Sequence, residues 1–388
     1  MEKVVLASIS GEIVLKSDRT RPRFERRLVN NIIDAFRRED VECNRVWIEA
    51  ARLYVSNCKD EESVEKAVKV LSRVFGIHGV AVAHLVEYSD LNDLAERVKE
   101  IAGEWVRDKR FAVRARRSGV EPFTSLDAAR VIGAALYPLS QGVDLENPEV
   151  EVFVEIRGNK AYIHRGMSRG PDGLPIGVEG RAIVLFSGGL DSPAAAWMAA
   201  KRGIEVDLVH YVLASPLSII DALRVGRKLA RFWLYGYRPK LYVFDFRPVT
   251  AAIAGMVENS YAQIVLRLAM YVVAEKFALA EGYDAIYTGE SVGQVSSQTL
   301  KNLYALTRAR PLNVPLIRPL AGFDKEEIVS LTRRIGVYEE AAKTREYCQL
   351  ARGLVATRAD PDKLLREYEK IEGIVELAST RYIEIPLA

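Results

Sequence analysis

The sequence has few cysteines and no long apolar run, and both absences exclude classes of protein. Only Cys43, Cys58 and Cys348 occur among 388 residues. Three widely spaced cysteines are too few for a disulfide framework, a CxxC redox pair or a zinc or iron–sulfur knuckle, so Cys43 and Cys58 are expected to be structural. No leader-like segment follows Met1 and nowhere do 18 apolar residues run together, which predicts a cytoplasmic protein without a membrane partner.

The chain also lacks an overall charge of one sign. Its 55 basic and 52 acidic side chains leave a net charge of +3, so any affinity for nucleic acid must come from local clusters. Two such clusters occur in the N-terminal half, and their members could neutralise RNA phosphates. They are Lys16, Arg19, Arg21 and Arg23, and then Arg110, Arg114, Arg116 and Arg117. Charge runs are usually solvated faces, so the residues alone leave RNA binding open.

The apolar pattern divides the chain, which has no internal repeat or low-complexity segment. Residues 1–80 alternate strand-like and helical stretches in the order β-α-β-β-α-β, which is typical of a ferredoxin-like domain. Residues 81–168 predict a second small α/β unit, and the Gly- and Pro-containing segment 169–180 predicts a linker. In residues 181–388, short apolar runs alternate with long helical stretches. This pattern predicts a doubly wound parallel sheet, in which ligands bind beyond the carboxyl ends of the strands.

The stretch LFSGGLDSPAAAWM, residues 185–198, places two glycines between a strand and a helix. Ser192 is expected to cap that helix and Pro193 to occupy its first position. Glycines allow close approach of phosphate, and backbone N–H groups at a helix start favour its negative charge, so the stretch predicts an anion site. It is neither a Walker A loop nor the dinucleotide fingerprint. The alternative is a tight turn in an unrelated α/β fold.

The SGGxDS pattern resembles the pyrophosphate loop of ATP pyrophosphatases, which cut ATP between its α and β phosphates. Further stretches, spread over nearly the whole chain, are similar to the tRNA 4-thiouridine synthetase (tRNA sulfurtransferase) family. They are GEIVLKSDRTRPRFERRLVNNI, FAVRARRSGVEPFTSLDAARVIGAAL, TGESVGQVSSQTLKNL, PLIRPLAGFDKEEI and EYCQL. In that family a ferredoxin-like domain and a THUMP RNA-binding domain precede the pyrophosphatase domain. The resemblance therefore implies these three domains for residues 1–80, 81–168 and 181–388.

The resemblance also implies roles for three catalytic residues. Asp191 would hold Mg²⁺ or orient a phosphate-bound group, although aspartate also forms turns. Lys325, which alone would pass for an exposed helical residue, would neutralise charge that develops on the phosphates. Cys348 would handle sulfur, because the basic residues around it favour the thiolate, whereas a lone cysteine is more often structural.

The implied cofactors are ATP and Mg²⁺, with the ion carried by the nucleotide and no metal site in the protein alone. The residues expected around ATP are Leu185, Phe186, Ser187, Gly188, Gly189, Asp191, Ser192, His210, Tyr211, Arg267, Gly289 and Gln298. Strand-end backbone groups could contact the base, and Arg267 could reach phosphate. Taken alone, His210 is equally well explained as a satisfied core histidine.

The implied reaction adenylates a uridine carbonyl oxygen of tRNA, and sulfur then displaces AMP to leave 4-thiouridine. The implied partners are tRNA and a sulfur donor, either a cysteine desulfurase or sulfide, and a homodimer is open. Many bacterial members carry a C-terminal rhodanese domain and supply sulfur for thiamine. The sequence up to Ala388 contains no such domain, so the donor and a thiamine role stay open. Two alternatives remain: a related ligase or amidotransferase that acts on a small metabolite, and a catalytically silent tRNA-binding protein.

Overall fold

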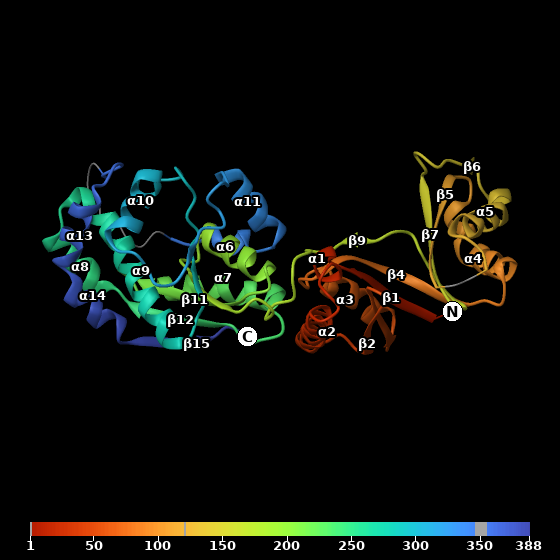
Figure 1. The fold of residues 1–388 in the computed structure, drawn as a ribbon, viewed down its shortest axis with the longest axis horizontal. Helices are drawn as coiled ribbons and strands as arrows, with labels where there is room; N and C mark the ends of the chain where they lie inside the picture. The colour runs from red at the N-terminus through yellow and green to blue at the C-terminus, as the bar shows by residue number, and fades with distance from the viewer. Residues whose placement is uncertain (1, 120–121, 346–354) are drawn as a thin grey trace. The chain divides into compact units, whose positions relative to one another are not determined.

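The computed structural model describes residues 2–119, 122–345 and 355–388. The chain divides into two compact units, Met1–Leu174 and Pro175–Ala388 (Figure 1). The elements of the N-terminal unit are β1 (Glu2–Ile9), α1 (Gly11–Val14), α2 (Arg21–Arg38), β2 (Cys43–Glu49), β3 (Arg52–Cys58), α3 (Glu61–Leu71), β4 (Ile77–Glu87), α4 (Leu91–Val106), β5 (Arg110–Ser118), α5 (Ser125–Leu136), β6 (Gly142–Val143), β7 (Val150–Arg157), β8 (Lys160–His164) and β9 (Ser168–Arg169). Those of the C-terminal unit are β10 (Arg181–Leu185), α6 (Asp191–Lys201), β11 (Glu205–Val212), α7 (Ser218–Trp233), β12 (Lys240–Asp245), α8 (Arg247–Met256), α9 (Ala262–Glu281), β13 (Ala285–Tyr287), α10 (Leu300–Ala309), β14 (Leu316–Ile317), α11 (Lys325–Arg334), α12 (Tyr338–Ala341), α13 (Pro361–Glu369), α14 (Glu372–Ser379) and β15 (Tyr382–Pro386). None of the described helices is long and apolar enough to cross a membrane.

The N-terminal unit is built on one continuous sheet, whereas the sequence predicted two separate small α/β units. Its described strands lie in the order β2-β3-β1-β4-β8-β7-β5-β6, with β9 beside β4. Strand β4 is long enough to serve both halves, since it pairs with β1 from Ile77 to Leu85 and with β8 from His84 to Glu87. The predicted β-α-β-β-α-β order is confirmed by the succession β1, α2, β2, β3, α3, β4, and its last strand also belongs to the second half.

Cys43 and Cys58 form a disulfide, which the cysteine count and spacing did not predict. Strands β2 and β3 are antiparallel, and their register sets Cys43 opposite Cys58. The two Cα atoms are 3.9 Å apart and the sulfur atoms are bonded. The cysteines were expected to be structural and too widely spaced for a disulfide framework. The bond was not foreseen, because a separation of 15 residues in sequence is closed by one hairpin.

An ion pair between a partly buried arginine and a buried glutamate connects the two halves of the N-terminal sheet. The guanidinium of Arg52 on β3 donates to both carboxylate oxygens of Glu155 on β7, at 2.9 and 3.0 Å. Burial acts to raise the pKa of Glu155, whereas the nearby His164 and the Arg52 charge lower it, and the net result is a pKa of about 2. Glu155 is thus held as a carboxylate, in a place where an unpaired charge would be costly.

The C-terminal unit contains a second sheet, with helices on both faces. Its described strands lie in the order β14-β13-β10-β11-β12-β15. All neighbours up to β12 are parallel, which confirms the predicted parallel sheet, and β15 is added as an antiparallel edge strand. The order reverses at β10, because α6 leads to β11 on one side while β13 lies on the other. Such a reversal opens a crevice beyond the carboxyl ends of the strands.

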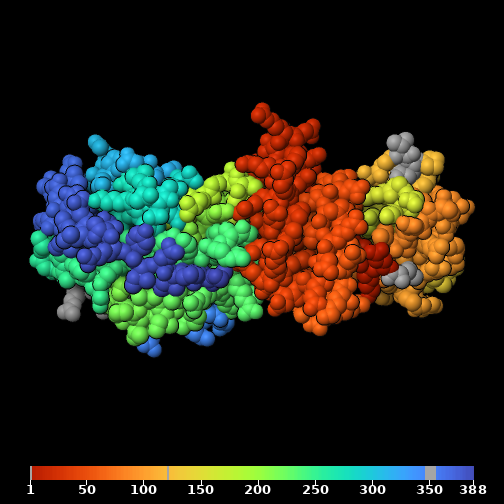
Figure 2. All heavy atoms as spheres, turned by 90° about the horizontal axis from the view of Figure 1, so that it is seen from below, coloured from red at the N-terminus to blue at the C-terminus, as the bar shows by residue number. Residues whose placement is uncertain are grey.

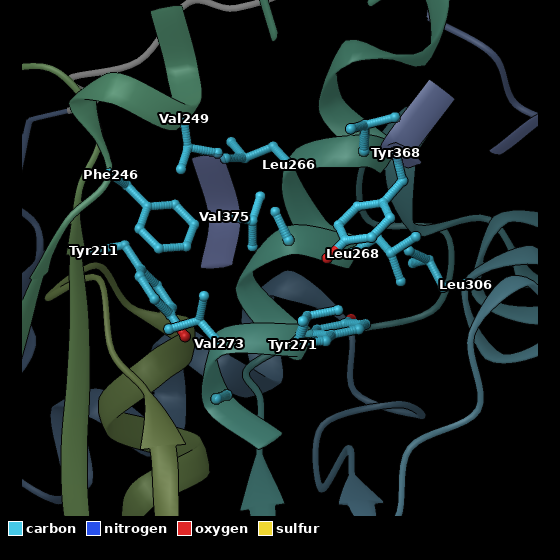
Figure 3. Packing of buried hydrophobic residues seen from close by; sticks show 14 of the residues in the cluster. Tyr211, Phe246, Val249, Leu266, Leu268, Tyr271, Val273, Leu306, Tyr368 and Val375 are labelled. Atoms are coloured by element: carbon cyan, nitrogen blue, oxygen red, sulfur yellow. The ribbon is translucent and has the colours of Figure 1, made fainter. Parts of the chain in front are cut away.

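The main core of this unit lies between the sheet and the 20-residue helix α9. This helix is apolar on nearly all sides, as expected for a helix that is buried all round. Figure 3 shows its side chains Leu268, Tyr271 and Val273 among residues from other elements, including Tyr211 of β11 and Tyr368 of α13. On the other face of the sheet, α6 packs on β10, β11 and β13. The start of α6 therefore lies at β10, with β11 on one side of it and β13 on the other.

Replacing Glu155 with Gln should lower the free energy of unfolding of the N-terminal unit by about 1–3 kcal/mol, because the variant leaves the partly buried Arg52 without its counter-charge. The pKa of Glu155 in the folded protein lies below its ordinary value of 4.5. The ion pair therefore makes its full contribution to the stability of the fold at pH values above 4.5. Its contribution is lost as the pH falls toward 2. Calorimetric unfolding of the full chain between pH 7 and pH 3 should show the two proteins converging as the pH falls.

The matched control is Lys66→Met, which breaks the exposed pair of Lys66 with Glu62. An exposed pair one helical turn apart contributes only about 0.3–0.5 kcal/mol. An equal loss of stability in the two variants would contradict the assignment of Glu155 as a buried, stabilising carboxylate.

Candidate functional site

The loop between β10 and α6, residues 186–190, is the predicted anion site and is called the anion loop below. Gly188 has a φ of +84°, and a Cβ there would lie 3.1 Å from the Cα of Ala222 on α7. Helix α6 begins at Asp191, so Ser192 is the second helical residue and Pro193 the third. The prediction that Ser192 caps the helix and that Pro193 opens it was wrong by two positions. The Ser192 hydroxyl instead accepts from the backbone N–H of Gly188 at 3.2 Å and holds the loop in its turn.

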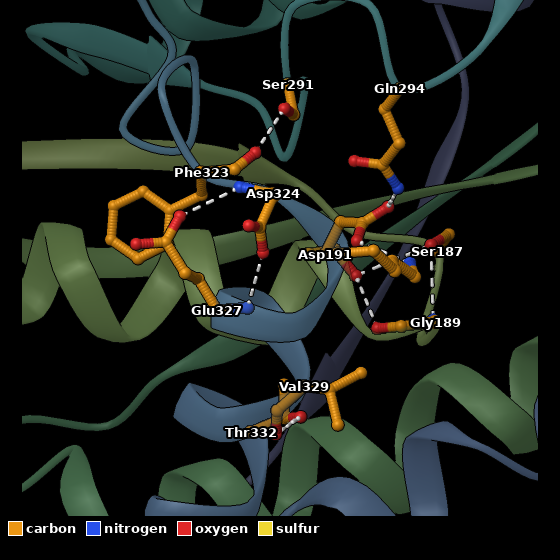
Figure 4. A network of polar contacts seen from close by, with 12 residues as sticks. Ser187, Gly189, Asp191, Ser291, Gln294, Phe323, Asp324, Glu327, Val329 and Thr332 are labelled. Carbon is orange, nitrogen blue, oxygen red and sulfur yellow. Dashed lines mark hydrogen bonds and ion pairs between the residues drawn. The ribbon is translucent and has the colours of Figure 1, made fainter.

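The carboxylate of Asp191 is held by two donors from elsewhere in the sequence, of which Figure 4 shows Gln294. Lys325 Nζ at the start of α11 donates to Oδ1 at 3.0 Å, across a sequence separation of 134 residues. Gln294 Nε2, from the loop after β13, donates to Oδ2 at 3.1 Å. Asp191 and Lys325 keep 29% and 49% of their side-chain surface exposed. The pair therefore stays accessible to a ligand while its orientation is fixed.

Gly289, just after β13, is the point of closest backbone approach at this site. A Cβ at this position would lie 2.8 Å from the carbonyl carbon of Asp191 and 2.9 Å from its oxygen. Real Cβ atoms do not approach other atoms so closely, so no larger residue fits here without movement. The absence of a side chain at Gly289 lets the loop after β13 reach the anion loop, and that is how Gln294 comes to contact Asp191.

A cavity of about 620 Å³ opens beside this loop. It is lined by the carboxyl ends of β10 and β11, the start of α6, and parts of α9, α11 and α12. Of the residues expected around ATP, those that line it are Leu185, Phe186, Ser187, Gly189, Asp191, His210, Tyr211 and Arg267, and Lys325 lines it as well. The volume lies within the range of small-molecule sites. Apolar strand ends at one side and an anion loop at the other suit a ligand with a flat ring and phosphates.

The two strand-end aromatic residues of β11 line this cavity with their polar atoms already in use. His210 Nδ1 lies 2.9 Å from the carbonyl oxygen of Phe186, and Nε2 lies 2.9 Å from the hydroxyl of Ser218. Burial lowers the pKa of His210, so the ring is neutral, donates from Nδ1 and accepts at Nε2. The Tyr211 hydroxyl donates to the carbonyl of Met270 at 2.7 Å. Both side chains shape the wall and leave polar recognition to the backbone.

Arg267 on α9 reaches the cavity from a buried ionic cluster. Its guanidinium pairs with Glu290, and a second nitrogen donates to the hydroxyl of Ser297 at 3.2 Å. Glu290 also accepts from Arg318 at 2.8 Å and from the Tyr271 hydroxyl. Burial acts to raise the pKa of Glu290, but the two guanidinium groups lower it below its ordinary value. Two arginines on one buried carboxylate leave this wall of the cavity positively charged.

Four of the residues expected around ATP lie outside the cavity lining, and the predicted catalytic residue Cys348 lies outside the described residues. Gln298 accepts from the backbone N–H of Ser291 at 3.2 Å and supports the loop after β13, while Gly188 and Ser192 shape the anion loop, as Gly289 does from the other side. Cys348 falls in the undescribed segment 346–354. The last residue described before it, Arg345, lines the cavity. No group of three His, Cys, Asp or Glu side chains suited to a metal occurs in the described part of the chain.

The sequence analysis missed residues whose roles depend on contacts between distant segments. Gln294 and Glu290 both lie in the TGESVGQVSSQTLKNL stretch, but that stretch alone does not identify the residues with which they form hydrogen bonds or ion pairs. Thr344, whose hydroxyl donates to the carbonyl oxygen of Gly188 at 2.7 Å, lies 156 residues from it in sequence. The cluster of polar residues after a buried strand was the one available signal in the sequence. It indicates the region of the site but does not identify individual residues.

Three family models match the chain. The ThiI ferredoxin-like domain matches residues 8–81, the THUMP domain residues 88–164, and the model described as Thiamine biosynthesis protein (ThiI) residues 177–372. The chain belongs to the ThiI family. Similar relatives of this ThiI chain include a tRNA sulfurtransferase of Desulfurococcus amylolyticus, 47% identical over 97% of this chain and 77% of the relative. A probable tRNA sulfurtransferase of Sulfurisphaera tokodaii is 41% identical over 95% and 97%.

A solved structure agrees with these relatives over the whole ThiI chain. It is a crystal structure of a 4-thiouridine synthetase–RNA complex with bound ATP, and it matches with a TM-score of 0.83 at 29% identity. The match covers 100% of each chain. The fold and family predicted from the sequence are thereby confirmed.

Replacing Gly289 with Ala should weaken binding of inorganic pyrophosphate by about tenfold, because overpacking of this kind typically costs about 1–3 kcal/mol. The added methyl group must push the Asp191 backbone away and disturb the anion loop. The measurement is calorimetric titration of pyrophosphate into the full chain. Gly255→Ala is the control, since a Cβ on Gly255 of α8 meets nothing within 4 Å. Equal affinity in both variants would refute the role assigned to the Gly289 contact.

Proposed function

We propose that this ThiI-family chain is an ATP-dependent tRNA sulfurtransferase that converts a uridine of tRNA to 4-thiouridine. The proposal depends on one observation: Asp191 and Lys325 form an ion pair next to the anion loop, and both line a cavity large enough for a nucleotide. The 4-thiouridine synthetase of similar fold, whose crystal structure is described as an RNA complex with bound ATP, supports both ligands. The chain would work in the cytoplasm, where its substrate tRNA is found.

The first step is adenylation of the target uridine. Its 4-oxygen attacks the α-phosphorus of ATP, the bond to the bridging oxygen of the β-phosphate breaks, pyrophosphate leaves, and the uridine N3 proton is released. The anion loop holds the phosphates, and Lys325 offsets negative charge on the oxygens as that bond breaks. Asp191 keeps Lys325 in place from one side while Gln294 fixes Asp191 from the other. Arg267 adds positive charge from the opposite wall.

Mg²⁺ fits this site as a companion of the phosphates. Asp191 offers one partly exposed carboxylate, and such ions are commonly bound by one or two carboxylates together with substrate phosphates. When bound with ATP, the ion supplies further positive charge to the phosphates. No dedicated protein cage is needed for that role.

The second step exchanges oxygen for sulfur. A sulfur nucleophile attacks carbon 4 of the adenylated base, the carbon–oxygen bond breaks and AMP leaves. Cys348, three residues after Arg345 of the cavity wall, is the residue proposed to handle this sulfur, delivered as sulfide or as the persulfide of a cysteine desulfurase. With a persulfide, the terminal sulfur is transferred, and the remaining sulfur–sulfur bond must be cleaved by a second thiol. A homodimer is compatible with this chemistry and is not required by it.

The basic clusters of the N-terminal unit are proposed to bind the tRNA. Their members differ in exposure and in whether a carboxylate already pairs with them. Figure 2 shows a red N-terminal part of the chain projecting from the surface. In the first cluster, Arg19 and Arg23 are exposed. In the second cluster Arg110 and Arg114 pair with Asp144 at 3.1 Å and with Glu151 at 2.7 Å. Such pairing reduces the positive charge available to phosphate.

Replacing Asp191 with Asn should reduce tRNA-dependent pyrophosphate release by roughly a hundredfold or more, since the amide no longer anchors the Lys325 charge. Binding of tRNA should stay within a few-fold. The assay combines unmodified tRNA, Mg-ATP and sulfide, and measures pyrophosphate together with the absorbance of 4-thiouridine. Asp245→Asn, at an exposed carboxylate that ends β12, should leave both products unchanged. Adenylation that proceeds without tRNA would favour a small-metabolite ligase, and tight tRNA binding without pyrophosphate release a silent binding protein.

Replacing Arg116 with Gln should weaken tRNA binding and reduce the slope of log affinity against log salt by about one, because each phosphate contact releases counterions. Arg116 is exposed and forms no ion pair with other described residues. Arg114→Gln, two residues away on the same strand, should have a smaller effect, because Glu151 already neutralises Arg114. Equal effects at both positions would show that the carboxylate partners do not limit binding.

A further inference from the structure

The exposed side of α10 carries large apolar and basic side chains that the fold does not use. Helix α10 and the loop before it expose Leu300 by 69%, Tyr304 by 60%, Val295 by 48% and Val292 by 44%. These four residues, together with Lys301 and Arg308, are called the α10 surface below. Exposed apolar groups gathered on one element commonly mark an interaction site.

The helical repeat separates this surface cleanly from the core. Leu303 and Leu306 lie on the inner side of α10 and belong to the buried core beside α9. Leu300, Tyr304 and Arg308 follow one another at intervals of four residues, and Lys301 lies beside them, so they form one outward stripe. An aromatic ring flanked by two cations on the same stripe is suited to stack on a base and to contact its phosphates.

Charge distinguishes the kinds of partner that this surface fits. Residues 291–310 contain Lys301, Arg308 and Arg310 and no acidic residue, and of these Arg310 is paired with Glu275 at 2.9 Å. A second copy of the chain, docked through the same patch about a two-fold axis, would bring like charges together. Interfaces between proteins are also depleted in lysine. A single-stranded nucleic acid fits this surface better, because its phosphates match the basic side chains and its flat bases match the apolar ones.

The α10 surface is connected to the catalytic carboxylate by a short and well-held loop. Ser291 is fixed by its hydroxyl bond to the carbonyl of Phe323 at 2.6 Å, and Thr299 by its hydroxyl bond to the carbonyl of Thr357 at 2.7 Å. Between these anchors, Gln294 contacts Asp191. A ligand on the α10 surface therefore lies on the same segment that positions the reacting groups.

We infer that the α10 surface docks the unpaired strand of tRNA that carries the target uridine, with an adjacent base on Tyr304 and phosphates at Lys301 and Arg308. The inference rests on the proposed function, because it takes tRNA as the substrate. It assigns a second RNA contact to the C-terminal unit, in addition to the basic clusters of the N-terminal unit. Its purpose is to present one nucleotide beside the anion loop.

The test uses the full chain, Mg-ATP and a tRNA transcript with the target uridine. Tyr304→Ala should lower kcat/KM for tRNA in pyrophosphate release by about tenfold, because loss of one stacked base has an effect of this order. The KM for ATP should not change. The double variant Lys301→Gln with Arg308→Gln should reduce the slope of log tRNA affinity against log salt by between about one and two. Thermal unfolding should match that of the unchanged chain, because these side chains are exposed.

Leu377→Ala is the matched control, since Leu377 is 73% exposed on α14 and lies on no basic stripe. It should leave both tRNA parameters unchanged. Unchanged tRNA kinetics in Tyr304→Ala would overturn the inference. A loss of dimer in sedimentation, with unchanged tRNA kinetics, would instead assign the surface to contacts between copies. If the unchanged chain releases no pyrophosphate with tRNA, the proposed function fails, and the tRNA affinities of the variants still decide whether the α10 surface binds RNA.

Discussion

The contact between Gly289 and the backbone of Asp191 is the constraint on which the catalytic unit depends. It joins the ends of β10 and β13, where the sheet order reverses, at a separation that leaves no room for a Cβ atom. Once the two loops touch, Gln294 reaches one oxygen of Asp191, and Lys325 reaches the other. The chemistry assigned to the site is therefore a consequence of close backbone packing, and the side chains add charge to a geometry that the main chain has already set.

Much of the fold was predictable because it follows from local patterns. Short apolar runs between amphipathic helices predicted the parallel sheet, and the alternation in residues 1–80 predicted the ferredoxin-like order. The failures concern pairing between segments. Sequence spacing cannot show that Cys43 and Cys58 share a register on adjacent strands, or that β4 continues from one half of a sheet into the other. The two-residue error at Ser192 has a different origin, since its hydroxyl bonds back to Gly188 instead of capping the helix.

The candidate site divides in the same way. Asp191 could be found from its loop, because the strand–glycine–helix pattern is local, and Lys325 was suggested by resemblance alone. Gln294 and Glu290 could not be assigned, because their functions depend on partners that come from separate elements. Glu290 is the clearest case, since a buried glutamate is costly by itself and becomes favourable only where α9 and the segment after β14 each bring an arginine to it.

In the proposed function, binding of the RNA and selection of the target nucleotide are carried out by different parts of the chain. Cations of the N-terminal unit are proposed to bind tRNA phosphates, but phosphate contacts carry no direct information about sequence. Selection of one uridine must then depend on contacts to the base itself, made where the base meets the reacting phosphate. In the proposed mechanism that place lies beside Asp191, on the segment that continues from Gly289 through Gln294 into α10. An enzyme built in this way can bind many tRNAs through one unit and restrict reaction to a single position through the other.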